Sequence, residues 1–231
     1  MTTLRTARDR ARAEVAAEIL SAARAHLAVT GAAGLSLRAV ARDLGLVSSS
    51  AVYRYFANRD ALLTALIVEA YDSLGDDVDR VVEANEGQAP LERWVGTARA
   101  VRDWAVAHPH EYSLLYGSPV PGYAAPDDTV VPGTRVTRAL IQIVEDARVA
   151  GRLGPVAPDG LHHEVLADMR AVIEYTDTGL SAEHLFAVIL AWTQLFGLVG
   201  FEVFGQTRGI ITNHAEFLRD AATRMGSAIG L

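Results

Sequence analysis

A run of three serines followed by a tyrosine and an arginine contains the side chains that best suit contact with a nucleic acid. Ser48, Ser49 and Ser50 precede Tyr53 and Arg54 by little more than one helical turn. Small hydroxyl side chains let a backbone approach a groove closely, and a guanidinium group pairs with phosphate or guanine. The free N–H groups at the start of a helix also favour phosphate. This chemistry suits duplex DNA.

A pair of short helices must position these side chains. Ser36 is a suitable N-cap for a helix whose apolar residues recur every three or four positions, and Gly45 ends that helix. A second short helix buries Val52 and Phe56 and leaves the serines, the tyrosine and the arginine facing outward. Two short helices joined by a glycine turn are typical of a helix-turn-helix. The same pair also occurs as a plain packing unit, in which the tyrosines are core aromatics.

The segment from residue 36 to residue 63 resembles the signature of the TetR family of bacterial transcription regulators. It reads SLRAVARDLG, then LVSSS, then AVYRYFANRDALL. The helix spacing, the Tyr-x-Tyr-Phe segment and the Arg-Asp-x-Leu-Leu run agree with that signature. Farther on, residues 104–112 and 117–123 resemble one actinobacterial type of ligand domain. One departure is the stretch from Gly45 to Tyr53, which is one residue longer than the usual family spacing.

The resemblance implies a set of contacts with the DNA backbone. Ser36 would place its amide or hydroxyl on a phosphate, and Arg38 would reach a base edge or a phosphate. Tyr53 and Tyr55 would hydrogen-bond phosphates, and Arg59 would clamp a flanking phosphate. The full predicted DNA-binding set is Ser36, Arg38, Ser48, Ser49, Ser50, Tyr53, Arg54, Tyr55 and Arg59.

Two further features of the N-terminal region belong to the predicted interface. Arg54 is the candidate for reading the sequence through a guanine, with a phosphate contact as the alternative. The extra residue before Tyr53 leaves open which of the three serines enters the groove. Four arginines near the N-terminus would form an arm that follows the minor groove, namely Arg5, Arg8, Arg10 and Arg12.

The charge of the chain is distributed unevenly. Residues 1–60 hold nine arginines and five acidic residues, a net charge of +4, and the remaining residues hold twelve arginines and 23 acidic residues, a net charge of −11. A basic N-terminal region followed by an acidic remainder suits a DNA-binding domain joined to a domain with a different function. The chain has no cysteine, and its N-terminus lacks the apolar core of an export signal. We therefore expect a cytoplasmic protein.

Helical periodicity continues through the rest of the chain, and no segment alternates with the period of a strand. We expect an all-α fold. Residues 1–57 would form a three-helix DNA-binding domain, and residues 58–231 a larger helical domain for ligand binding and dimerisation. Residues 117–133 hold four prolines and three glycines and should form a long loop. That loop is either a lid over a pocket or an excursion without a role.

Residues 185–204 are apolar nearly all round. Their length would suit a membrane span, but Gln194 and Glu202 fall inside the segment and basic flanks are missing, so we expect no membrane contact. A helix that is apolar on every side needs cover on every side, which a second copy of the chain would supply. A monomer that encloses this helix is the alternative. In the family that the chain resembles, the last two helices form a twofold interface, and the predicted homodimer contacts are Leu185, Ile189, Trp192, Phe196, Val199, Phe217 and Ala221.

Aromatic residues of the helical body could line a ligand pocket, although such residues also serve as plain core. They are Trp94, Trp104, Tyr112, Tyr116, Phe186 and Trp192. His162 and His163 lack the spacing of metal ligands, so we expect no metal and no cofactor. The sequence contains no nucleophile elbow, phosphate-binding glycine loop or paired carboxylates, so we expect no catalytic residues and no enzyme activity.

These observations predict a sequence-specific, DNA-binding transcription regulator. By resemblance, it would be a repressor that an unknown small-molecule effector releases from double-stranded operator DNA. A twofold dimer places two recognition helices on successive major-groove faces, so the operator should be an inverted repeat. A protein of the same fold that binds DNA or a partner protein without an effector is the alternative. The effector, the operator, and the choice between repression and activation stay open at this point.

Overall fold

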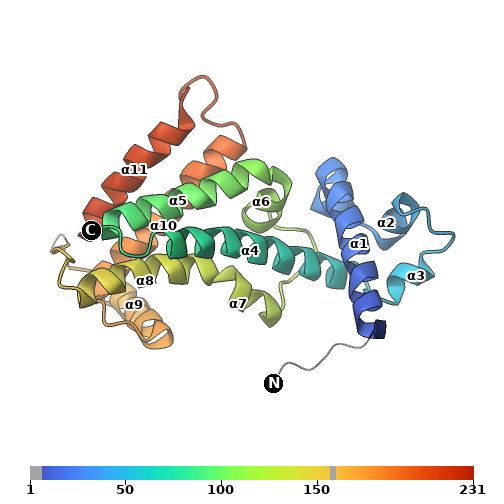
Figure 1. Ribbon diagram of the computed structural model, residues 1–231, viewed down its shortest axis with the longest axis horizontal. Coiled ribbons are helices and arrows are strands. Elements are labelled where there is room, and N and C mark those ends of the chain that lie inside the picture. Colours follow the sequence, from blue (N-terminus) through green and yellow to red (C-terminus); the bar gives the residue numbers. More distant parts are fainter. Residues whose placement is uncertain (1–6, 157–159) are drawn as a thin grey trace. The chain divides into compact units, whose positions relative to one another are not determined.

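The computed structural model describes residues 7–156 and 160–231 (Figure 1). Helices occupy most of this part of the chain, and it contains no β-strand. The all-α fold class predicted from the periodicity is therefore confirmed. The chain divides into two compact units. The first consists of the chain up to Asp72 together with Pro109–Pro132, and the second of Ser73–His108 together with Gly133–Leu231.

The first unit contains the helix-turn-helix. Its elements are α1 (Ala7–Thr30), η1 (Ala32–Gly34), α2 (Leu37–Asp43), α3 (Ser50–Tyr53), the first half of α4 (Arg59–Ala84), α6 (Pro109–Tyr116), η2 (Asp127–Thr129) and most of α7 (Val130–Gly133). The helices meet through the apolar side of each, which is why these short segments are stable. The buried core includes Ile19 and Ala23 of α1, Val40 of α2, Val52 of α3 and Leu63 of α4.

The segment that follows α6 packs against this same core. Val120 and Tyr123 are partly buried against it, and the Tyr123 hydroxyl lies 2.9 Å from the Thr64 hydroxyl of α4. The first unit is therefore larger than the DNA-binding domain that we predicted over residues 1–57. The stretch 117–133 carries η2 and α7, and part of it belongs to the packing of the first unit, so it is more ordered than the free excursion that we considered.

The second unit is a bundle of longer helices. It contains the second half of α4, α5 (Pro90–Ala107), α8 (Arg135–Val149), α9 (His163–Thr176), α10 (Ala182–Val203) and α11 (His214–Ile229). Helix α5 packs against α8, α10 and α11. Gly226 of α11 permits a close approach to α5, because a Cβ atom there would lie 2.5 Å from the Cδ1 of Leu91 and 3.1 Å from the Cδ1 of Trp94.

Helix α10 is the single helix of the described residues that is long and apolar enough to cross a membrane. It packs against α5, α8, α9 and α11. Its Glu202 is engaged by an arginine of α5. These contacts pack α10 against four other helices of the second unit.

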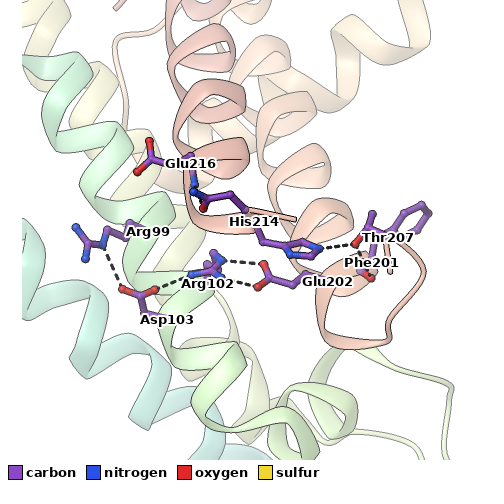
Figure 2. A network of polar contacts seen from close by, with 9 residues as sticks. Arg99, Arg102, Asp103, Phe201, Glu202, Thr207, His214 and Glu216 are labelled. Atoms are coloured by element: carbon purple, nitrogen blue, oxygen red, sulfur yellow. Dashed lines mark hydrogen bonds and ion pairs between the residues drawn. The ribbon is translucent and has the colours of Figure 1, made fainter. Parts of the chain in front are cut away.

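An ion pair joins α5 to the end of α10 (Figure 2). The Arg102 guanidinium donates two hydrogen bonds to the Glu202 carboxylate, at 2.8 and 2.5 Å, and a third to Asp103 at 3.2 Å. The Arg102 and Glu202 side chains are 15% and 16% exposed. The hydrogen bond to Glu202 is the main reason that the pKa of Arg102 is raised. This ion pair fixes the end of α10 against α5.

Substituting Arg102 with methionine is expected to lower the free energy of unfolding by about 2–3 kcal/mol. The variant leaves the Glu202 carboxylate largely covered and without its guanidinium partner, but partial exposure keeps the loss below that of a fully buried pair. Urea-induced unfolding of the single variants Arg102→Met and Glu202→Leu and of the double variant measures this coupling. The double variant should lose less stability than the sum of the two single variants; additive losses would contradict the pairing.

A second ion pair, between Glu145 and Arg148, predicts how the stability of the fold depends on pH. The Glu145 carboxylate of α8 accepts two hydrogen bonds from Arg148, at 2.9 and 2.7 Å, and one from the Thr178 hydroxyl at 3.0 Å. The hydrogen bonds from Arg148, followed in effect by those from Thr178 and the Gly179 backbone, lower the pKa of Glu145 to about 2. Because the folded pKa lies below the ordinary value of 4.5, this group contributes stability above pH 4.5 and loses it as the pH falls toward 2.

Substituting Glu145 with glutamine should therefore reduce the decrease in the free energy of unfolding that occurs as the pH falls below 4.5. Urea unfolding between neutral pH and the acid range is the measurement. The variant should be less stable than the wild type at neutral pH, and the difference should shrink as the pH falls below 4.5. Glu174→Gln, at an exposed position on α9, serves as the control. Parallel curves for wild type and Glu145→Gln would contradict the assignment.

Candidate nucleic-acid interface

The serine run forms a hydrogen-bonded turn at the start of α3. The Ser48 hydroxyl accepts a hydrogen bond from the Ser50 backbone N–H at 3.2 Å and donates one to the Ser50 hydroxyl at 3.0 Å. Ser48 and Ser50 are exposed, whereas Ser49 is partly buried. Val52, two residues later, is completely buried and anchors the short helix to its core. The turn thus presents two hydroxyl groups outward from a fixed backbone.

The end of α3 presents larger side chains. Tyr53 is 46% exposed, and the Arg54 side chain is exposed. Tyr55 is partly buried, and the guanidinium of Arg12 lies 5.4 Å from the centre of its ring, within the range of a cation–π interaction. Arg12 also donates a hydrogen bond to the Arg54 carbonyl oxygen at 3.3 Å. These contacts hold α1 beside the end of α3.

The arginines that we expected to form an N-terminal arm have a different structure. Arg8, Arg10 and Arg12 lie within α1, which begins at Ala7. A chain that follows the minor groove must be extended, so these three residues do not form such an arm. Arg5 lies outside the described residues. Sequence reasoning missed the role of Arg12 against α3, because no local pattern links residues 42 positions apart.

The two residues at the start of α2 lie as predicted on an exposed surface. Ser36 is the N-cap of α2, and its hydroxyl accepts a hydrogen bond from the Ala39 backbone N–H at 3.2 Å. The hydroxyl proton is left for an outside acceptor. Arg38 follows on the first turn, and its side chain is exposed.

Arg59 is engaged inside the first unit. Its guanidinium donates to the carbonyl oxygens of Leu35 at 3.2 Å and Ala32 at 2.9 Å, and it lies 3.5 Å from a carboxylate oxygen of Asp60. Those two carbonyls belong to the connection between α1 and α2. The structure therefore uses Arg59 to brace that connection, so the predicted phosphate contact would have to come from the nitrogen that faces Asp60.

The predicted dimer residues differ in how far their own chain covers them. Leu185 and Val199 are covered by their own chain, at 0% and 1% exposure, so neither is free to contact a second copy. Partly buried positions are Ile189, Trp192, Phe196 and Ala221, and Phe217 is 45% exposed. The exposed apolar side of α10 instead runs through Leu190 and Phe201, and Phe204, the C-cap residue of α10, is also exposed. The sequence could not reveal this side, because α10 is apolar all round.

The aromatic residues that we predicted to line a pocket are divided between the two units. Tyr112 and Tyr116 belong to the first unit, where their ring centres lie 5.1 Å apart and burial raises the pKa of both hydroxyls. In the second unit Trp94 and Trp104 are buried in the core, and the indole N–H of Trp104 donates to Ser73 at 2.9 Å. Tyr112, Trp94 and Trp104 are buried, and Tyr116 is partly buried.

Two grooves of the second unit are candidates for ligands instead. One, of about 260 Å³, lies between α10 and α11 and includes the predicted residue Phe186. The other, of about 530 Å³, lies beside α5 and α11. Its floor includes Leu91 and Val95, and its rim carries Arg99, Arg102 and Arg219. Trp192 lines neither and instead packs against Phe196, with ring centres 5.8 Å apart.

No group of three or more histidine and acidic side chains among the described residues is arranged to hold a metal ion. His162 and His163 are both exposed, and their ring centres lie 4.6 Å apart. They contact Glu164, at 3.6 and 3.9 Å.

Comparisons with known proteins cover both regions of the chain. Residues 19–66 match the family model of bacterial regulatory proteins of the tetR family, and residues 94–225 match the tetracyclin repressor-like C-terminal domain. The HTH-type transcriptional regulators Rv1816 of Mycobacterium tuberculosis and Mb1846 of Mycobacterium bovis are each 38% identical to this chain over 220 residues. The match covers 95% of this chain and 93% of theirs.

Solved structures agree with these sequence matches. The crystal structure of the regulatory protein SCO4313 is 32% identical in sequence and superimposes with a TM-score of 0.77, covering 95% of this chain and 98% of that chain. The transcriptional regulator PfmR of Thermus thermophilus is 15% identical, with a TM-score of 0.61, and covers 90% of this chain and 96% of its own. At that identity PfmR supports the fold alone.

Proposed function

Since this chain belongs to the TetR family of bacterial transcriptional regulators, we propose that it is a repressor that binds an inverted-repeat operator as a homodimer and leaves it when a small effector binds. The regulator carries a helix-turn-helix for DNA binding. Residues 1–57 act as the DNA-binding domain and residues 58–231 as the domain for dimerisation and effector binding. The proposal includes no catalysis and places the protein in the cytoplasm with its DNA.

The outward presentation of α3 is the observation on which this proposal rests. Val52 is buried, while Ser48, Ser50, Tyr53 and Arg54 face solvent around it. Hydroxyl groups and a guanidinium at one end of a short helix pair match the donors and acceptors of a major groove and its phosphates. Ser36, Arg38 and Tyr55 would add backbone contacts around this centre.

The exposed apolar side of α10 supports the proposed dimer. Leu190 and Phe201 are 47% and 56% exposed, and Phe217 of α11 is 45% exposed. Gly197 lies between the first two along α10, and a Cβ atom there would meet nothing within 4 Å. A second copy of the same surface would cover these side chains by twofold symmetry. The partly buried Ile189, Trp192, Phe196 and Ala221 stay predicted interface residues.

Effector binding is assigned to the second unit. The groove of about 530 Å³ beside α5 and α11 lies within the size range of small-molecule sites. Helix α4 runs from the first unit into the second, so a change in the second unit can bias the first through this helix. A coupling free energy of about 1–3 kcal/mol would be enough to release the operator.

Selection of bound fragments from the source genome tests the proposal. Purified full-length protein is mixed with sheared genomic DNA, and the retained fragments are sequenced and then titrated in mobility-shift assays at several salt concentrations. We expect a shared inverted repeat and an affinity that falls steeply with salt. Fragments without a common repeat, or binding that salt does not weaken, would contradict the proposal. Compounds handled by the neighbouring gene products are then added to the complex to identify the effector.

A further inference from the structure

Val47 lies in the connection between α2 and α3, the stretch that is one residue longer than the usual family spacing. The connection is fixed on both sides of this residue. Gly45, with a φ of 68°, and Leu46 donate their backbone N–H groups to carbonyls of α2, each at 2.9 Å. The Ser48 hydroxyl accepts the N–H of Ser50 at 3.2 Å. The backbone of Val47 is thus held between two hydrogen-bonded turns.

The side chain of Val47 is fully exposed. Its exposed fraction is 107%, the highest of the large apolar side chains in the described chain, whereas Leu46 beside it is 39% exposed. A side chain that touches nothing in the free protein contributes no burial to stability. Its substitution therefore changes what the surface can bind and leaves folding nearly unaffected.

The surroundings of Val47 are the polar groups of the proposed interface. Exposed hydroxyls of Ser48 and Ser50 follow it directly, and Tyr53 and Arg54 end the same short helix. Each of those groups suits a hydrogen-bond partner on a phosphate or a base edge. The one apolar group on the base edges of the major groove is the C5 methyl of thymine. An isopropyl group held rigidly at this place is complementary to that methyl.

We propose that Val47 contacts the C5 methyl of a thymine and thereby sets the base preference at one position of each operator half-site. The inference rests on the proposed function, because it requires duplex DNA against the α2–α3 connection. It adds a residue that reads a base by apolar contact to an interface otherwise composed of hydrogen-bonding groups.

Deoxyuridine substitution tests this contact, because deoxyuridine pairs as thymine does but lacks the methyl. The operator found by selection is synthesised with each thymine replaced in turn, and its affinity for wild type and Val47→Ala is measured by fluorescence anisotropy. At one thymine of each half-site, we expect the wild type to lose about fourfold in affinity, the effect of one methyl-sized contact. Val47→Ala removes the contact from both half-sites of the dimer, so it should bind the thymine operator about 16-fold more weakly than the wild type and should lose nothing further with deoxyuridine.

Val29→Ala is the matched control, because Val29 is 85% exposed on α1 of the same unit. It should respond to deoxyuridine as the wild type does. The inference is overturned if Val47→Ala and the wild type have the same affinity and respond equally to every deoxyuridine. Wild-type protein that binds no duplex, or binds all duplexes equally, would instead overturn the proposed function and with it this inference.

Discussion

Substituting Arg54 with alanine is expected to weaken binding to the operator about 5- to 150-fold, the loss of ~1–3 kcal/mol that a good guanidinium–guanine pair contributes. Arg54 is exposed and directly follows the last residue of α3. Its backbone is held by the hydrogen bond that Arg12 donates to its carbonyl oxygen. The side chain therefore leaves the surface that the serines also occupy from a fixed backbone, so the backbone has little order to gain on binding.

Mobility-shift titrations of the Arg54 variant distinguish the two contacts open to this side chain. If Arg54 reads a guanine, the variant should lose affinity for the operator but bind unrelated duplexes as the wild type does. If it contacts a phosphate, binding to all duplexes should weaken alike. The number of counterions released on binding, measured from the salt dependence of the affinity, should decrease by about one. Arg152→Ala removes the same charge from an exposed position in the second unit and should leave affinity unchanged. Equal binding by wild type and Arg54→Ala would remove Arg54 from the interface.

Substituting Leu190 with glutamate is expected to convert the dimer to a monomer and to weaken operator binding by about 100-fold or more. Leu190 is 47% exposed on α10 and lines the groove of about 260 Å³ between α10 and α11. In the proposed twofold interface each copy would bury this side chain, so two carboxylates would lose their hydration. Separate monomers would then bind each half-site without the gain that comes from a linked partner.

Sedimentation or light scattering gives the mass of the variant, and titration against full and half operators gives its affinity. The variant should bind a half-site about as well as the wild-type monomer would, since the first unit is unchanged. Tyr175→Glu is the control, because Tyr175 is a 64% exposed side chain on α9 of the same unit. A Leu190→Glu protein that stays dimeric would show that the interface lies elsewhere on the second unit.

The helix-turn-helix is the part of the molecule that local sequence signals predict best. Ser36 caps α2 through the hydrogen bond that its position and type favour, and Gly45 takes the positive φ that ends a helix. Val52 is buried and Ser48, Ser50 and Arg54 are exposed, as the apolar spacing predicts, whereas Ser49 and Phe56 are partly buried. Each of these features depends on contacts within a few residues, and such contacts can be recognised from the types and spacing of neighbouring residues.

The second unit shows where the sequence was insufficient. Leu185 and Leu190 are the same residue type on the same helix, yet one is buried and the other 47% exposed. When a helix is apolar on every side, its sequence pattern does not indicate which side is buried. The packing of α5, α8, α9 and α11 around α10 decides which side stays exposed. The same packing decides the burial of Trp94 and Trp104, two of the aromatic residues predicted to line a pocket.

By itself the sequence determined the helical fold, the family and the short helix pair that faces DNA, because caps, glycines and apolar spacing act over short distances. Tertiary structure decided which arginines are free to bind. Arg59 is drawn to the carbonyls of Leu35 and Ala32, and Arg12 to the end of α3, through contacts between segments 24 to 42 residues apart. Contacts between residues so far apart produce no local sequence pattern. The hydrogen-bond partners of each guanidinium group are therefore known only from the packed structure.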